Sequence, residues 1–293
     1  MDLLKALAER TIVLDGAMGT ELMRRGFASG GCPEERNVTH GEVVAQIYRD
    51  YFAAGADMVE TNSLGGTRLK LAAHGHGDDV QRFNSAAVRL AVAVRDGEFP
   101  DRLVAGDVGP TGKFVKPMGE LEPEELREAF AEQVAALAEG GADLISIETM
   151  FDLTEARLAV EGARSVSALP VMVSLTYKFT PRGYRTMMGV DPKTAVGTLL
   201  VAGADVVGCN CSIEADEMVG LVGELRAATK APVVAQPNAG QPRLEGGQTI
   251  YDETPAHFAE LMPELVAQGA NAVGGCCGTT PEHIAALVAA LRP

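Results

Sequence analysis

The sequence predicts one α/β domain spanning residues 1–293, folded as an eight-stranded (β/α)8 TIM barrel. Three observations predict this fold. Eight short apolar runs alternate with longer amphipathic segments, which is the pattern of buried parallel strands and the helices that cover them. The tripeptide Gly-Ala-Asp, or Gly-Ala-Asn in one case, begins every second run. No linker rich in Pro, Ser or Gly divides the chain, and a doubly wound open sheet usually has fewer such units.

Each apolar run is short and rich in β-branched or small residues, as expected of a buried strand. In chain order the runs occupy residues 11–16, 55–61, 102–110, 141–149, 169–177, 203–211, 231–240 and 269–277. The segments between them place apolar residues at helical spacing, most clearly at 43–54, 126–140 and 255–268. The alternation therefore predicts a parallel sheet surrounded by helices.

The composition excludes several classes of function. A formal net charge of −15, with no basic run to offset it, argues against binding to nucleic acid or to an anionic membrane surface. The N-terminal stretch mixes charges with leucine and is not a signal peptide, and no apolar run is long enough to span a bilayer. We therefore expect a soluble, cytoplasmic protein. The sequence does not indicate its oligomeric state.

Nearly every predicted strand ends in a carboxylate, an amide, a hydroxyl or a thiol. Because active sites of such barrels lie at the C-terminal ends of the strands, these side chains are expected to meet at one rim. We therefore interpret the rim as a functional mouth rather than as ordinary loop polarity. In chain order the residues are Asp15, Glu60, Asn62, Asp107, Glu148, Thr149, Thr176, Asn210, Cys211, Gln236, Asn238, Cys276 and Cys277.

Three of the five cysteines fall at this rim. Cys211 ends the sixth run, and the adjacent pair Cys276 and Cys277 ends the eighth, so only one strand separates them in a closed barrel. Neighbouring residues of a regular strand point to opposite faces, so the pair shares a ligand only if the backbone leaves the strand. The flanking glycines at 274, 275 and 278 allow that freedom.

Three interpretations of these thiols remain open at this point. They are a strained vicinal disulfide, inert buried cysteines, or a zinc site with three cysteine ligands and one open position. An odd number of cysteines in a chain without a signal peptide argues against a disulfide framework. Cys209 is assigned a packing or supporting role. Cys32 lies in a glycine-rich loop and has no identifiable partner.

A three-thiolate zinc site would favour one kind of chemistry. Three thiolates leave the zinc complex anionic and a poor activator of water, and the five histidines show no H-E-x-x-H spacing. A substrate thiol added to such a site would ionise near neutral pH and stay nucleophilic. Alkylation of a bound thiol is therefore the reaction that best matches this ligand set.

Seven motifs along the chain resemble the zinc-dependent homocysteine S-methyltransferase family. They are LDGAMGTEL from Leu14, GADMVETNS from Gly55, GDVGPTG from Gly106, IET from Ile147, GCNCS from Gly208, PNAG from Pro237 and GGCCGTTPEH from Gly274. The stretch ETNSLGGTRLKLAAHG is most similar to the homocysteine-binding domain of cobalamin-dependent methionine synthase.

The resemblance implies a zinc site formed by Cys211, Cys276 and Cys277, to which homocysteine adds its sulfur. It implies that Asp15 and Glu148 bind the amino group of homocysteine, which suits an ammonium ion. The remaining implied roles are distributed over several amides, hydroxyls and one carboxylate. Asn238 would fill the open zinc position before substrate arrives, Ser174 and Thr176 would hold the substrate carboxylate, and Asn210, Glu60 and Asn62 would support these groups.

The resemblance leaves the methyl donor open. Methylcobalamin on a separate corrinoid protein is the leading expectation, and S-methylmethionine or S-adenosylmethionine is the alternative. Betaine is disfavoured because the chain has no Trp and carries Leu64-Gly65-Gly66 where betaine enzymes place an aromatic residue. The segment 177–192 is interpreted as a lid, as a docking surface or as a solvated loop. Rival hypotheses are a different acceptor thiol, such as selenohomocysteine or a coenzyme thiol, and a non-catalytic zinc-stabilised subunit.

Overall fold

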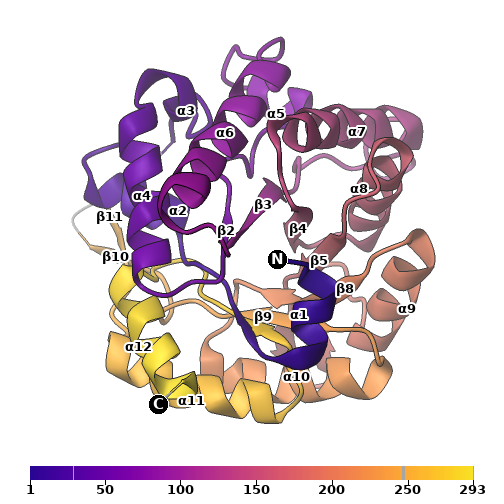
Figure 1. The fold of residues 1–293 in the computed structure, drawn as a ribbon. Coiled ribbons are helices and arrows are strands. Elements are labelled where there is room, and N and C mark those ends of the chain that lie inside the picture. The colour runs from indigo at the N-terminus through magenta and orange to yellow at the C-terminus, as the bar shows by residue number, and fades with distance from the viewer. Residues whose placement is uncertain (29, 246–247, 293) are drawn as a thin grey trace.

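The computed structural model describes residues 1–28, 30–245 and 248–292 and confirms the predicted barrel. Eight parallel strands form one sheet in the order β1-β12-β9-β8-β5-β4-β3-β2, and a parallel bridge between Leu14 and Met58 joins its two edges (Figure 1). The strands are β1 (Ile12–Val13), β2 (Met58–Glu60), β3 (Leu103–Val108), β4 (Leu144–Met150), β5 (Val171–Leu175), β8 (Val206–Asn210), β9 (Val233–Gln236) and β12 (Ala272–Val273).

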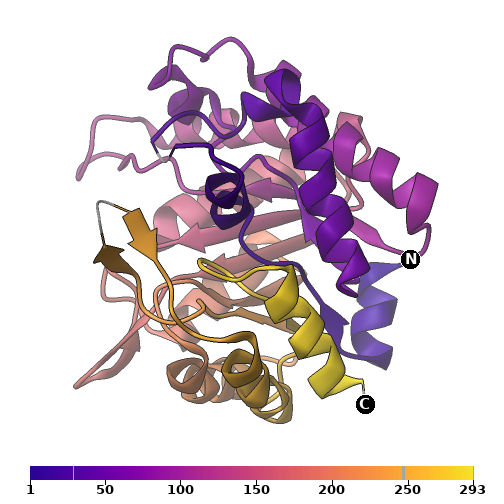
Figure 2. The ribbon, with the colours of Figure 1, turned by 90° about the vertical axis from the view of Figure 1, so that its left-hand side faces the viewer.

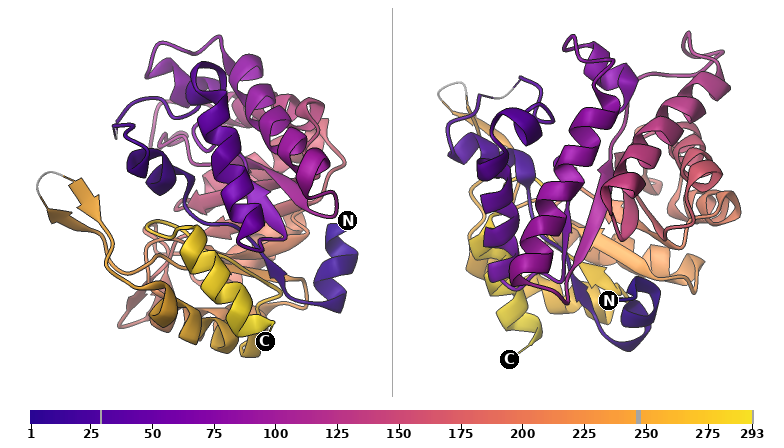
Figure 3. Two further views of the ribbon diagram at one scale, coloured as in Figure 1. Left: turned by 60° about the vertical axis from the view of Figure 1, so that its left-hand side comes forward. Right: turned by 45° about the horizontal axis from the view of Figure 1, so that its top comes forward.

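Helices surround this ring of strands and separate one strand from the next (Figures 1 and 3). Each of the eight apolar runs contains one barrel strand, as predicted. The helices are α1 (Leu3–Glu9), α2 (Met18–Arg24), α3 (Arg36–Thr39), α4 (Gly41–Ala53), α5 (Arg68–Ala72), α6 (Val80–Glu98), α7 (Pro123–Gly140), α8 (Leu153–Val166), α9 (Pro192–Ala202), α10 (Ala215–Ala228), α11 (Pro255–Ala267) and α12 (Pro281–Leu291).

Two antiparallel hairpins, which the sequence did not predict, lie outside the barrel. The first pairs β6 (Lys178–Thr180) with β7 (Gly183–Arg185) inside the segment interpreted as a lid, a docking surface or a loop. The second pairs β10 (Arg243–Glu245) with β11 (Gln248–Ile250). It projects beyond the barrel at the end opposite α1 and the two chain termini (Figure 2).

The recurring tripeptide has a structural explanation at the N-terminal end of the strands, which we call the bottom face. Its glycine adopts a left-handed conformation after a helix, with φ between 102° and 115°. Its acid or amide then begins the next strand and accepts a hydrogen bond from a backbone N–H of the neighbouring strand. The four pairs are Asp57 with Val13, Asp143 with Val104, Asp205 with Val171 and Asn271 with Val233, at 2.8–3.0 Å.

The barrel interior changes from apolar to polar along its axis. Because side chains in a strand alternate, every second residue faces inward. Near the bottom face these residues are apolar and pack against Leu3 and Leu7 of α1, which closes that end. Toward the C-terminal end, which we call the mouth, side chains such as Glu60, Asn210 and Gln236 join in hydrogen bonds inside the barrel. The polar layer therefore lies directly below the mouth.

No helix among the described residues is both long and apolar enough to cross a bilayer.

Candidate metal and substrate site

Three thiols meet at the mouth as the sequence predicted. The sulfurs of Cys211, Cys276 and Cys277 all lie within 4.8 Å of one another, and the Cys211–Cys277 distance is 3.8 Å. All three are free thiols. Tetrahedral zinc with bonds of about 2.3 Å to sulfur separates its sulfurs by about 3.8 Å. The spacing of these thiols therefore fits a zinc ion.

The local backbone explains how the thiols converge. Cys211 follows β8 with a φ of 58°, a left-handed conformation that turns its side chain out of the strand pattern. Gly278 also adopts this conformation, with a φ of 84°. Gly274 and Gly275 serve a different purpose from the one expected. A Cβ atom on Gly274 would lie 2.6 Å from Leu14 Cβ. These two glycines therefore allow close packing of residues 274–280, which we call the thiol loop.

The electrostatics of the three sulfurs favour a bound cation. Hydrogen bonds from the Cys211 and Cys276 thiols lower the pKa of Cys277. The hydrogen bonds that Cys276 donates to the other two sulfurs, together with its burial, raise the pKa of Cys276. One thiolate thus forms readily while further ionisation is opposed. A divalent cation would remove that opposition, because thiolates are the form in which cysteines bind metals.

Four carboxyl groups lie at this end of the barrel: those of Asp15 and Asp107 are buried, and those of Glu60 and Glu148 are half-buried. Asp15 accepts a hydrogen bond from the Glu60 backbone, and Glu60 accepts from Ser146 at 2.6 Å and from Gln236 at 2.8 Å. Burial, followed by repulsion from neighbouring carboxylates, raises the pKa of Asp15, of Asp107 and of Glu148. None of the four carboxyl groups forms an ion pair with Lys or Arg in the part of the chain that the structure describes.

Unpartnered oxygens mark where a ligand would bind. Asp15 Oδ1, Asp107 Oδ1 and Asn238 Oδ1 are buried with no hydrogen-bond partner in the structure. Buried polar atoms are rarely left without a partner, and groups that are so left call for an explanation. The two carboxylate oxygens suit a positively charged group, and the Asn238 oxygen suits a cation or a donor.

A cavity of about 560 Å³ lies at the mouth; Asp107 lines it, whereas Asp15 and Asn238 are not among its lining residues. Its polar lining includes the three thiols with Asp107, Glu148 and Thr149, and its apolar lining includes Met18, Met23, Pro33 and Leu64. Asp107 and Thr149 were expected at the rim but were given no specific role, and Tyr251 was not singled out from the sequence. Asp107 ends β3, so its place in the rim was the available signal. Tyr251 follows the β10–β11 hairpin, and no sequence motif pointed to it.

The other predicted residues divide into two groups. Asn62 lines the cavity and binds Asn37 and the Pro33 carbonyl, which supports the rim. Ser174 is buried and donates to Asn210 Oδ1 at 2.7 Å. Thr176 is nearly buried and lies outside the residues that line the cavity.

The two remaining cysteines are far from this chemistry. Cys209 is fully buried in the apolar layer between the barrel and its helices. Cys32 donates a hydrogen bond to Glu34 at 3.4 Å, and burial together with Glu34 raises the pKa of Cys32 to about 11.

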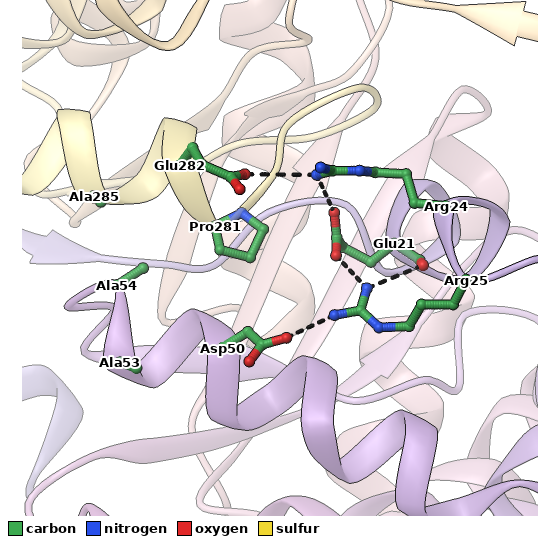
Figure 4. Close-up of a pocket in the computed structure, with 9 residues that line it drawn as sticks. All are labelled: Glu21, Arg24, Arg25, Asp50, Ala53, Ala54, Pro281, Glu282 and Ala285. Carbon is green, nitrogen blue, oxygen red and sulfur yellow. Dashed lines mark hydrogen bonds and ion pairs between the residues drawn. The ribbon is translucent and has the colours of Figure 1, made fainter.

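A second cavity, of about 670 Å³, lies between α2, α4 and α12 (Figure 4). Its charged groups are paired with one another: Arg24 reaches both Glu21 and Glu282, and Arg25 reaches Glu21 and Asp50. This network connects α2, which follows Asp15, to α12, which follows the thiol loop. We interpret it as a brace for the two segments that carry site residues.

A family model described as homocysteine S-methyltransferase matches residues 12–291. The chain belongs to this family. The methionine synthases of Mycobacterium leprae and Mycobacterium tuberculosis are 35% and 34% identical to it over 307 aligned positions. These alignments cover 99% of this chain, but the chain spans only about a quarter of the length of those curated relatives.

Solved structures of the homocysteine methyltransferase MmuM from Escherichia coli share the fold over their whole length. The metallated form has a TM-score of 0.81 and 28% identity, covering 98% of this chain and 99% of that one. The oxidised form has a TM-score of 0.80 and 27% identity, covering 98% of each chain. The predicted family membership and barrel are thus confirmed.

Proposed function

We propose that this chain is a zinc-dependent methyltransferase that transfers a methyl group to the sulfur of L-homocysteine and yields methionine. The observation that carries the proposal is the meeting of three thiols with the carboxyl groups of Asp107 and Glu148 in the lining of one cavity. Cys211, Cys276 and Cys277 would hold the zinc ion, which supplies the Lewis acidity that lowers the pKa of a substrate thiol.

The protein's own residues would bind and orient the substrate. Asp15 and Glu148 would accept hydrogen bonds from its ammonium group, which would neutralise part of the buried negative charge. Asn238 would place its unpartnered oxygen near the thiols until substrate arrives. Ser174 and Thr176 are proposed to act near the substrate carboxylate, and Asn210, Glu60 and Asn62 to support the groups that touch substrate.

The reaction would be an in-line displacement. The homocysteine sulfur forms a bond to the methyl carbon while the bond from that carbon to the donor breaks, and the electron pair of the broken bond leaves with the donor. The thiol proton goes to solvent, so no general base is required after ionisation. The tight cavity would supply orientation, because reacting atoms must be held close together and aligned.

We further propose methylcobalamin on a separate corrinoid protein as the donor. The similarity to methionine synthases favours this donor. S-methylmethionine or S-adenosylmethionine is the alternative, and the similarity to MmuM keeps small donors in consideration.

A methyl-transfer assay tests this function. The zinc-loaded chain is given homocysteine with methylcobalamin, S-methylmethionine, S-adenosylmethionine or betaine in turn, and methionine is quantified. We expect methionine from methylcobalamin, and none from betaine. A parallel sample depleted of zinc by a chelator should be inactive and regain activity when zinc is restored. Undiminished turnover without zinc would contradict the mechanism.

The same assay examines the rival hypotheses. If selenohomocysteine or a coenzyme thiol were methylated faster than homocysteine, the acceptor would have to be revised. A chain that binds zinc tightly but is not stabilised by homocysteine in a thermal-unfolding titration would favour a non-catalytic subunit.

A further inference from the structure

The side-chain amide of Asn210 contacts both the carboxylate of Glu148 and the sulfur of Cys276. Asn210 ends β8 and is fully buried. Its Nδ2 donates to Glu148 Oε2 at 2.7 Å and to Thr149 Oγ1 at 2.8 Å, and it contacts Cys276 Sγ at 3.7 Å. One planar NH2 group therefore touches a carboxylate proposed to bind the ammonium ion and a sulfur proposed to bind zinc.

The other end of the same amide is also fixed. Asn210 Oδ1 accepts a hydrogen bond from the Thr149 backbone N–H at 2.8 Å and another from Ser174 Oγ at 2.7 Å. With both ends of a rigid amide engaged, the side chain has no room to change rotamer without breaking several buried hydrogen bonds. One side chain thus contacts both Glu148 and Cys276, while the backbone N–H of Cys276 is held separately by the Pro237 carbonyl.

The backbone around this amide is strained. Among the described residues, the non-glycine residues with positive φ are Thr149 at 60°, Cys211 at 58° and Ser212 at 65°. Thr149 is bonded by the Asn210 side chain, Cys211 directly follows Asn210, and Ser212 follows Cys211. Such conformations persist only where the surroundings impose them, and they concentrate at functional sites. The hydrogen bond from Thr149 N to Asn210 Oδ1 is one contact that imposes them here.

We propose that Asn210 is a positioning residue that fixes the distance between the Glu148 carboxylate and the Cys276 sulfur, and so selects the acceptor by its length. This inference rests on the proposed function. An acceptor must reach from its ammonium group at Glu148 to its sulfur beside the thiols. Homocysteine has one methylene more than cysteine, which lengthens that reach by roughly one carbon–carbon bond of about 1.5 Å. A site fixed at both ends accommodates only one of these lengths well.

The usual cost of one extra or missing methylene group sets the expected change in the homocysteine–cysteine affinity ratio. A single methylene typically changes recognition by about 10- to 200-fold in a shaped site. If Asn210 supplies the fixed spacing, its removal should lower the preference for homocysteine over cysteine by about tenfold or more. The loss of a merely structural residue would weaken both ligands by the same factor.

The test measures dissociation constants of homocysteine and cysteine by calorimetry on zinc-loaded wild-type and Asn210→Ala proteins, with zinc content verified. Asn271→Ala is the matched control, because that amide also spans two elements but does so at the bottom face, binding the Val233 N–H and the Leu7 carbonyl. We expect the affinity ratio to fall in Asn210→Ala and to stay at the wild-type value in Asn271→Ala.

Two further measurements keep the test decisive. The acid 4-sulfanylbutanoate lacks the amino group, so its affinity should be the same in wild type and Asn210→Ala. Ser174→Ala removes the hydroxyl that donates to Asn210 Oδ1. Any contact of that hydroxyl with the substrate carboxylate is common to homocysteine and cysteine, so the ratio of their affinities should still shift in the same direction by less, even if Asn210→Ala does not fold.

An unchanged ratio in both variants would overturn the proposal while leaving the proposed function intact. A wild-type protein that binds no homocysteine would instead overturn the proposed function, and this inference with it.

Discussion

At the bottom face of the barrel the buried carboxylate of Asp57 is enclosed by the guanidinium groups of Arg10, Arg102 and Arg292. At the mouth, by contrast, four buried or half-buried carboxyl groups form no ion pair with Lys or Arg among the described residues. Burial alone would raise the pKa of Asp57, but hydrogen bonds from Arg10 and Arg292 outweigh burial and hold that pKa below its ordinary value. At the mouth, burial raises the pKa of Asp15, Asp107 and Glu148.

Buried aspartates therefore have their pKa shifted in opposite directions at the two ends of the barrel. The bottom face satisfies its charges internally, and its contacts repeat in every second strand, as expected of a stability element. The mouth leaves charges and oxygens unpaired, which costs stability until a cationic ligand or a metal compensates them. The mouth therefore differs from the bottom face in two ways: its contacts do not repeat from strand to strand, and several of its polar groups lack partners. Mutations at the two ends should separate stability from binding.

The largest expected effect is at the thiols. Replacing Cys277 with Ser should reduce bound zinc from about one equivalent to near zero and abolish methyl transfer, because catalytic zinc commonly depends on three protein ligands. Circular dichroism should show that the barrel still folds, since the core lies below the site. Metal analysis and the methyl-transfer assay check this. Retained zinc with full activity would remove Cys277 from the ligand set.

The bottom face should respond in stability alone. Asp57→Asn leaves the three guanidinium groups without their counter-charge and weakens the bond to the Val13 N–H. Those arginine side chains are 28–41% exposed, so solvent screens part of the loss. We expect the free energy of unfolding to fall by about 2–3 kcal/mol. The dissociation constant of homocysteine, measured on the folded protein, should stay within twofold; a tenfold weakening would break the proposed separation of the two ends.

Asp15→Asn should show the reverse behaviour. Losing one carboxylate that binds the ammonium ion should weaken homocysteine by about 10- to 100-fold, the usual range for a hydrogen bond between charged groups. The ligand-free protein should become more stable by about 1 kcal/mol, because the cost of burying a charged carboxylate and, after it, repulsion from Glu60 are relieved. Calorimetric binding and chemical denaturation measure the two effects. A destabilised variant with normal binding would assign Asp15 to structure.

The smallest effect is a pH dependence of opposite sign at the two ends. An unfolded Asp ionises near about pH 3.9. The pKa of Asp107 is raised, so between pH 3.9 and that higher value the folded state holds an extra proton and stability falls as pH rises. Asp107→Asn should therefore stabilise the protein by about 1 kcal/mol at neutral pH and by nothing near pH 4.

Asp57 behaves in the opposite way because its pKa is lowered. Its contribution to stability is present above about pH 3.9 and is lost as pH falls through the folded pKa. The deficit of Asp57→Asn should therefore shrink only in acid. Denaturation curves of both variants and wild type across pH 3.5–8 check these slopes; parallel curves would contradict the assigned shifts.

Much of this architecture was predictable because it depends on local patterns. Short apolar runs specify buried strands, and the barrel then forces strand ends such as Cys211 and Cys276 to one rim. The resemblance supplied roles for Asp15 and Glu148. The tripeptide repeat was visible in the sequence, but its use of Asp57 as an acceptor for a neighbouring strand required the register of the sheet.

The rest depends on contacts between residues far apart in the chain. Thr149 and Ser212 have no sequence signal for a left-handed backbone, which the neighbouring contacts impose. The missing partner of Asp107 depends on tertiary geometry: Lys70 lines the same cavity, yet no ion pair joins the two among the described residues, and no local pattern reveals this. Tyr251 reaches the cavity from a hairpin whose position is set by the fold.

The short first strand has a consequence for the whole ring. β1 contributes only two residues, and its contact with β2 consists of the Leu14–Met58 bridge and the bonds between Val13 and Asp57. Because few hydrogen bonds join β1 to β2, we expect the ring of strands to open most easily at this junction, which we call the seam. Asp15 stands at the upper end of that seam and Asp57 with its arginines at the lower end. Because Asp57 is buried and its arginines are only partly exposed, salt should screen these ion pairs weakly, and the lower end of the seam should hold over a wide range of ionic strength.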